Sequence, residues 1–198
     1  DAAKKNIGFL PEQPPLYADM TVAEYLSFCY DLKECKLNKK EHIREICEVV
    51  KITDVYKRLL KNLSKGYKQR VGIAQALIGN PPVIIFDEPS AALTEAEIEE
   101  MFKIIRDLRE QQLGIVYISH RMDEIKVITD RVTVMRDGQY VGTLITKDCT
   151  KDDIINMMVG RVIYEDPKTK SAVAPDAPVV LKVEHLNAGK MVQDVSFE

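Results

Sequence analysis

Apolar runs of strand length alternate along the chain with segments whose apolar residues recur at helical spacing. Residues 83–86 (VIIF) form a continuous apolar run bounded by prolines and acidic residues, the pattern of a parallel strand buried on both faces. Residues 115–118 (IVYI) form a second such run, and residues 7–10 (IGFL) form a shorter one that ends at Pro11. These runs predict parallel strands of an α/β fold.

Helix start signals precede the amphipathic segments. The predicted capping pairs are Thr21 with Glu24, Asn38 with Glu41, Thr94 with Glu97, and Thr150 with Asp153. Ser64 is a further N-cap candidate, followed by a buried stripe at positions 67, 71, 74 and 78. The helix that follows Thr94 is expected to reach about Gln112. Between two strand-like runs near residues 131–145, Asp137-Gly138 predicts a β-hairpin.

The composition is that of a globular chain without strong charge. Of its 198 residues 45% are hydrophobic, and 28 Lys and Arg against 31 Asp and Glu give a formal net charge of −3. No basic run is long enough to follow a phosphate backbone, so nucleic acid is not an expected partner. The four cysteines show no Cys-x-x-Cys spacing, which is typical of reduced thiols in a cytosolic protein. No apolar run approaches the roughly 18 residues of a membrane span.

Residues able to do chemistry follow the predicted strands directly. Asp87 and Glu88 end the run at 83–86, and His120 comes just after the run at 115–118. In open α/β sheets, ligands bind at the carboxyl ends of the strands. One carboxylate there can hold Mg²⁺ on a nucleotide, and its neighbour can act as general base for an attacking water. Two solvated acids and a structural histidine are the simpler interpretation of the same residues.

A candidate anion site lies at the start of the helix that Ser64 caps. Gly66 permits close backbone approach, so free N–H groups and the positive end of the helix dipole would face an anion. We call this helix start the phosphate seat. An ordinary capped helix would show the same residues.

Residues 7–161 resemble the ATPases of ABC transporters. The resemblance is carried by LSKGYKQR at 63–70, similar to the signature usually written LSGGQ, by VIIFDE at 83–88, similar to Walker B, by PSAALT at 89–94, and by His120 at the position of the H-loop. The order and spacing of these motifs follow the family pattern. The resemblance implies the fold of a P-loop NTPase (RecA-like), with an ABC core and a helical subdomain over about residues 17–78.

The resemblance also implies roles for individual residues. Glu88 would be the general base, Asp87 a Mg²⁺ ligand, and His120 the contact to the γ-phosphate of ATP. The phosphate seat, offered by the signature to an opposite nucleotide-binding domain, would consist of Ser64, Gly66 and Gln69. The implied cofactors are therefore ATP and Mg²⁺.

Residues 12–15 lie where the family carries its Q-loop, whose glutamine reaches Mg²⁺ and the attacking water. A solvated turn is the alternative interpretation of these residues. Here Glu12 directly follows Pro11 and Gln13 comes one place later, so both side chains are candidates for this role. Gln13 is the one we assign to the nucleotide and the metal. Thr94 is a second departure from the family pattern, because many ABC proteins carry Asp at that position.

The chain divides into three predicted parts. Residues 1–161 would be a partial nucleotide-binding domain, residues 162–178 a proline-containing linker, and residues 179–198 the first strands of a second ABC domain. The sequence contains no Gly-x-x-x-x-Gly-Lys-Ser/Thr loop. The chain is therefore expected to be a fragment that lacks the Walker A half and is inactive by itself.

Two subfamilies contribute to the resemblance. Residues 7–76 resemble multidrug and gliding-type exporters, whereas the residues from Asp87 onward resemble the double-ATPase subunits of ribose and galactose importers. The expected parent is an ATP-hydrolysing subunit that drives monosaccharide import from the cytoplasmic face of the membrane. Its expected partners are transmembrane permease subunits and a second ABC domain. An exporter-type ATPase and a non-catalytic docking module are the alternatives.

Four further aromatic and histidine residues have less definite interpretations. Tyr17 and Tyr30 lie in the part that docks a permease in the family, although an aromatic residue of an amphipathic helix more often belongs to the core. His42 and His185 follow no strand end and are interpreted as incidental.

Overall fold

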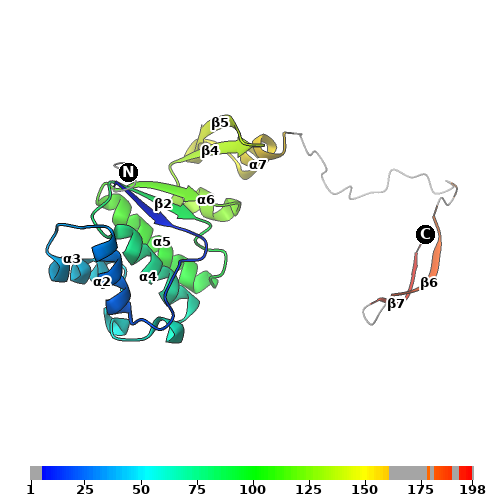
Figure 1. Cartoon of the computed structure of the whole chain (residues 1–198). Coiled ribbons are helices and arrows are strands. Elements are labelled where there is room, and N and C mark those ends of the chain that lie inside the picture. Colours follow the sequence, from blue (N-terminus) through cyan, green and yellow to red (C-terminus); the bar gives the residue numbers. More distant parts are fainter. Residues whose placement is uncertain (1–5, 161–177, 179–180, 189–191, 198) are drawn as a thin grey trace. The chain divides into compact units, whose positions relative to one another are not determined.

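The computed structural model describes residues 6–160, 178, 181–188 and 192–197 (Figure 1). Residues 1–160 form one compact unit and residues 161–198 a second. The linker predicted at residues 162–178 lies outside the described residues, apart from Pro178.

The first unit is built on a three-stranded parallel sheet. Its strands are β1 (Ile7–Leu10), β2 (Val83–Asp87) and β3 (Gly114–Ile118), with β2 in the middle. The register pairs Leu10 with Phe86 and Asp87 with Ile118. All three strands therefore end at one edge of the sheet, as the apolar runs predicted.

The elements that surround this sheet follow in chain order. They are α2 (Val22–Leu32), α3 (Lys39–Val49), the 3₁₀ turns η1 (Thr53–Val55) and η2 (Leu60–Asn62), α4 (Lys65–Leu77), α5 (Glu95–Glu110) and α6 (Met122–Ile128). Reciprocal capping boxes are present at Thr21 and Thr94, whereas Asn38 caps α3 in one direction only. Helix α5 ends at Glu110, slightly before the expected Gln112, because the chain turns towards β3.

The two faces of the sheet differ in burial. Leu10, Ile84 and Phe86 are fully buried on one face, where α4 packs on β1 and where Phe102 of α5 contacts the Tyr117 ring of β3. The other face carries half-buried or exposed apolar side chains, namely Ile7, Phe9, Val83, Ile85, Val116 and Ile118. The prediction that the run at 83–86 is buried on both faces is therefore wrong for the described residues, because none of their elements covers this second face.

The helices α2, α3 and α4 share one continuous core with the sheet. Tyr30 is 6% exposed and belongs to this core, whereas Tyr17 is 53% exposed. Of the two aromatic residues, only Tyr17 keeps a surface position suited to a partner. Among the described residues, no helix is both long and apolar enough to cross a bilayer.

A smaller core lies beneath a hairpin. Strands β4 (Arg131–Arg136) and β5 (Gln139–Ile145) pair antiparallel across Asp137 and Gly138, whose φ values of 52° and 75° suit a tight hairpin turn. The predicted hairpin is confirmed. After η3 (Thr146–Asp148), Thr150 closes a capping box at the start of α7 (Lys151–Val159). The described residues of the second unit form the antiparallel pair β6 (Val183–Ala188) and β7 (Val192–Phe197).

The residue that ends α2 and a side chain of α3 form hydrogen bonds with the C-terminal end of α4. Lys33 donates from Nζ to three carbonyl oxygens at this helix end, at distances of 3.0 to 3.3 Å. His42 is 4% exposed, and its Nε2 accepts the Gly79 N–H at 3.0 Å. His42, interpreted as incidental to function, thus has a structural role, because its ring accepts a backbone N–H just beyond α4 that has no backbone acceptor among the described residues.

The N-terminal end of α4 is joined to α5 through one carboxylate. Glu97 Oε1 accepts the Gly66 N–H at 3.1 Å, while Glu97 Oε2 accepts the N–H and the hydroxyl of Thr94, both at 3.0 Å. These hydrogen bonds, led by the one from the Thr94 backbone, lower the pKa of Glu97. A Cβ added at Gly66 would lie 2.8 Å from Glu97 Cδ and 2.9 Å from Cγ. Position 66 therefore requires glycine, because the Glu97 side chain packs against it.

The His42 contact predicts a specific pH dependence of stability. Burial lowers the pKa of His42, with a raising effect from Glu45 and a further lowering effect from Lys33. The ring therefore takes up its proton at a lower pH in the folded protein than in the unfolded chain, where a histidine titrates near pH ~6.5. Because the unfolded state binds the proton first, the free energy of unfolding should fall as the pH drops below about 6.5 and level off below the folded pKa.

Urea denaturation between pH 5 and pH 8, roughly spanning that histidine pKa, tests this dependence. His42→Leu should lower the free energy of unfolding by about 1–3 kcal/mol at the upper end, because the Gly79 N–H loses its acceptor. It should also flatten the pH profile. His185→Gln changes an exposed histidine that pairs with Asp194 in the second unit, so unfolding of the first unit should keep its wild-type profile. Equal slopes in wild type and His42→Leu would contradict the assignment.

The Gly66–Glu97 contact predicts a substitution whose effect changes sign. In the wild-type background, Gly66→Ala should destabilise the protein by about 1–3 kcal/mol, because the methyl group displaces the Glu97 carboxylate. In a Glu97→Ala background the same change should stabilise it by up to about 1 kcal/mol, since Ala favours a helix more than Gly does. A double-mutant cycle of denaturation curves measures both effects. The same effect in both backgrounds would show that Glu97 is not what requires glycine here.

Candidate functional site

The parallel register brings the three predicted motifs to one edge of the sheet. Pro11 and the residues predicted as the Q-loop follow β1, Glu88 follows β2, and His120 lies just beyond β3. The backbone N–H of Glu88 donates to the Ile118 carbonyl at 3.0 Å, which extends the β2–β3 pairing by one residue. Glu88 itself has a φ of 45°, in the left-handed region that non-glycine residues seldom adopt.

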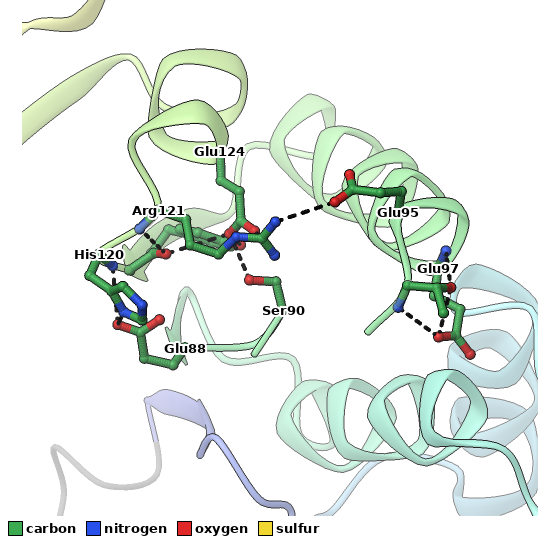
Figure 2. Close-up of polar contacts among 10 residues, drawn as sticks. Glu88, Ser90, Glu95, Glu97, His120, Arg121 and Glu124 are labelled. Atoms are coloured by element: carbon green, nitrogen blue, oxygen red, sulfur yellow. Dashed lines mark hydrogen bonds and ion pairs between the residues drawn. The ribbon is translucent and has the colours of Figure 1, made fainter. Parts of the chain in front are cut away.

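Glu88 and His120 contact each other directly, as Figure 2 shows. Glu88 Oε1 accepts the backbone N–H of His120 at 3.1 Å and lies 2.8 Å from His120 Nδ1. The Glu88 side chain is 22% exposed and the His120 side chain 74% exposed. The other carboxylate oxygen, Glu88 Oε2, is buried without a hydrogen-bond partner among the described residues. One oxygen of Glu88 is thus fixed while the other keeps its acceptor capacity.

Asp87 lies half-buried at the end of β2, on the sheet face opposite α4 and α5. Within the described part of the chain, no group of three His, Cys, Asp or Glu residues is arranged to enclose a metal ion. Mg²⁺ does not need such a group, because proteins hold it by one or two carboxylates together with phosphate oxygens and water. Asp87, a half-buried carboxylate at the end of β2, fits that donor set.

A cavity of about 420 Å³ brings the predicted Q-loop next to the signature helix. Glu12, Gln13 and Gln69 all line it, together with Pro89 from the loop after β2. Both Q-loop candidates therefore face the same space. Gln69 is 7% exposed and its Nε2 has no acceptor among the described residues. The predicted residues Asp87, Glu88, His120, Ser64 and Gly66 do not line this cavity.

The phosphate seat differs from its prediction. Ser64 is exposed and caps α4 by accepting the Tyr67 N–H at 3.3 Å, as expected of an N-cap. The Gly66 N–H, expected to be free, instead donates to Glu97. In this conformation a carboxylate of the chain occupies the position at the helix start where an external anion was expected. Thr94 and Glu97 were predicted as a capping pair, but nothing in their spacing indicated the contact with Gly66.

A buried carboxylate behind the Glu88–His120 pair was missed. Glu124 of α6 is 4% exposed and accepts hydrogen bonds from Ser90 Oγ and Tyr117 Oη, both at 2.7 Å. Arg121 forms an ion pair with its other oxygen at 2.7 Å (Figure 2). Burial, followed by the hydrogen bond to Glu124, raises the pKa of Tyr117 well above its ordinary value. The only sequence signal was an acidic residue shortly after His120, which is also what an ordinary helix start contains.

Comparison with known proteins places these features in a family. Residues 1–91 match the family model described as ABC transporter. The chain is 41% identical over 205 residues to an Agrobacterium fabrum (strain C58) protein named for ribose/galactose/methyl galactoside import ATP binding. It is 40% identical over 199 residues to the ribose import ATP-binding protein RbsA 3 of Rhizobium meliloti (strain 1021). Each match covers 100% of this chain but 39% of the relative, so the chain spans about two fifths of the length of these proteins.

A solved structure shows the same fold. CbiO1 from Clostridium perfringens, part of the ABC transporter complex cbiONQ, superposes with a TM-score of 0.69 at 23% identity, over 81% of this chain and 67% of that one. At this identity the likeness concerns the fold alone, which is that of the ABC ATPases, a branch of the P-loop NTPases. Together with the sequence matches, it shows that the chain belongs to the ATP-binding domain family of ABC transporters.

Proposed function

We propose that the chain is part of a subunit that hydrolyses ATP to drive import of a monosaccharide. The observation that carries this proposal is the Glu88–His120 contact at the adjoining ends of two parallel strands. It occurs in a chain 40% identical to a protein named for ribose import. The exporter-like character of residues 7–76 does not outweigh this, because the match to the ribose import protein extends over the whole chain.

The proposed roles follow from chemistry at the strand ends. Glu88 is the general base, because its Oε2 is an unused acceptor beside a carboxylate oxygen that His120 holds in place. Asp87 and Gln13 hold Mg²⁺, which would neutralise charge on the phosphates. His120 contacts the γ-phosphate. Ser64, Gly66 and Gln69 form the phosphate seat for the nucleotide of an opposite domain, and that nucleotide has to displace Glu97 from Gly66.

The proposed assembly places the subunit at the cytoplasmic face of a membrane. Its partners are transmembrane permease subunits, which would dock on the helical part around α2 and α3, and a second ABC domain. Residues 1–161 belong to a first nucleotide-binding domain, residues 162–178 to a linker, and residues 179–198 to the start of the second domain. The β6–β7 pair is consistent with such a start, and the relatives' greater length leaves room for both domains.

A segment exchange tests the proposed function. In the Agrobacterium fabrum relative, the aligned segment would be replaced by this chain, and uptake of labelled ribose and galactose would be measured in cells lacking the original protein. We expect uptake and Mg-ATP hydrolysis by the purified chimera. Glu88→Gln should lower kcat by about 10²-fold or more, because proton transfer to a positioned base contributes at least that much.

The control is Glu99→Gln, the same chemical change at an exposed, ion-paired position of α5. It should leave uptake and hydrolysis unchanged. Hydrolysis that withstands Glu88→Gln would refute the role of Glu88. A chimera that hydrolyses ATP but imports neither sugar would refute the proposed substrate while leaving the ATPase intact.

The 198 residues by themselves are expected to bind Mg-ATP weakly and not to hydrolyse it. Recognition of the phosphates in this class comes mainly from the P-loop backbone and its Lys, which the sequence lacks. The start of α4 can offset this by only ~1 kcal/mol. Calorimetric titration should show no saturation below about 1 mM. Micromolar binding, or turnover that Glu88→Gln abolishes, would reveal a phosphate cradle elsewhere in the chain.

A further inference from the structure

Glu124 is a buried charge to which the proposed chemistry gives no role. It lies in the first turn of α6, is 4% exposed, and does not contact Glu88 or His120 through any hydrogen bond of the described residues. A buried carboxylate is costly unless it is paired and hydrogen-bonded. Its partners therefore indicate what it holds in place.

Those partners come from two separate segments around the Glu88–His120 pair, the loop after β2 and residues 117–121. Ser90, in the loop after β2, donates its hydroxyl to Glu124 Oε2 at 2.7 Å, and Tyr117 of β3 donates to the same oxygen at 2.7 Å. Ser119 Oγ lies 3.5 Å from it. Arg121 pairs with Oε1 at 2.7 Å.

These contacts involve residues next to both members of the Glu88–His120 pair. Ser90 is two positions beyond Glu88, while Ser119 and Arg121 flank His120 on either side. The Arg121 N–H also donates to Ser119 Oγ at 3.0 Å, which closes the turn that carries His120. Glu124 thus joins the turn of His120 to the loop that leads away from Glu88.

The link that Glu124 makes between the His120 turn and the loop after β2 is strong because its partner Ser90 is buried. Ser90 is 1% exposed, so without Glu124 its hydroxyl would lose its acceptor in a place that water does not reach. Arg121 has one other carboxylate partner, Glu95, at 3.4 Å, but that side chain is 90% exposed. An exposed pair of this kind fixes a side chain weakly. Glu124 is therefore the group that determines where Arg121 and the turn before it lie.

We propose that Glu124 is a positioning residue that holds the backbone N–H and the ring of His120 on the Glu88 carboxylate. It touches neither a substrate nor the reacting atoms. The effect of Glu124 on ATP hydrolysis rests on the function proposed above. The effect of Glu124 on the geometry of the His120 turn does not.

Amide exchange in the 198-residue chain tests the geometric part. In the wild type, the His120 N–H is held by Glu88 Oε1 at 3.1 Å. Glu124→Ala should speed exchange of this amide about tenfold, the effect of losing one hydrogen bond of ordinary strength. Exchange of the His42 amide, bonded within α3, should not change. Glu95→Gln is the matched control, since it alters only the exposed partner of Arg121, and it should leave His120 exchange as in the wild type.

A conservative series keeps the test decisive if Glu124→Ala does not fold. Glu124→Gln retains an oxygen for Ser90 and Tyr117 but loses the charge that holds Arg121, so His120 exchange should be intermediate. Ser90→Ala and Tyr117→Phe each remove one donor and should each speed that exchange by less than Glu124→Gln does. Unchanged His120 exchange in the folded Glu124 variants would overturn the proposal.

Kinetics of the chimera test the catalytic consequence separately. Glu124→Gln should lower kcat several-fold with little change in KM, because misplacing His120 impairs the reaction rather than ATP binding. If Glu88→Gln leaves hydrolysis intact, the role proposed for Glu88 fails, and the exchange data still decide the role of Glu124. If Glu88→Gln abolishes hydrolysis but Glu124→Gln leaves kcat unchanged, the positioning role is refuted while the proposed function survives.

Discussion

The parallel pairing of β2 with β1 and β3 is the constraint on which the candidate site depends. Because side chains alternate along a strand, a register slip of one residue would exchange the faces that Asp87 and Glu88 present. Ile84 and Phe86 oppose such a slip, since both are fully buried against the helical layer and would have to move to the exposed face. The apolar residues of β2 therefore determine which carboxylate meets His120.

The loop between β2 and α5 is anchored at both ends by carboxylates. Near its start Ser90 donates to Glu124 of α6, and at its end the Thr94 N–H and hydroxyl donate to Glu97. Glu97 also accepts the Gly66 N–H at the start of α4. A continuous set of contacts thus runs from the turn of His120 to the phosphate seat.

Local features of the fold could be predicted from the sequence, because they depend on residues close together in the chain. The apolar runs, the capping boxes at Thr21, Thr94 and Thr150, and the hairpin at Asp137-Gly138 are all of this kind. The prediction that β2 is buried on both faces was wrong, because an apolar run shows only that a strand is able to be buried on both faces. It does not show whether another layer covers it.

The contacts that the sequence did not reveal join residues far apart in the chain. His42 and Gly79 are 37 positions apart, Ser90 and Glu124 are 34 apart, and Gly66 and Glu97 are 31 apart. Periodicity contains no information about such pairs. Glu124 was least predictable, because an acidic residue in the first turn of a helix is ordinarily explained by the helix dipole.

The geometry of the Glu88–His120 pair restricts how both residues could act on a phosphate. His120 presents Nδ1 to a carboxylate oxygen, which can only accept, so Nδ1 carries the proton in this contact. A phosphate oxygen is likewise an acceptor, so Nε2 can bond to it only if Nε2 is protonated as well. The contact with Glu88 thus leaves Nε2 as the ring nitrogen of His120 that can face a phosphate. Glu88 could then take a proton from water only at Oε2, the oxygen that the protein leaves without a partner among the described residues.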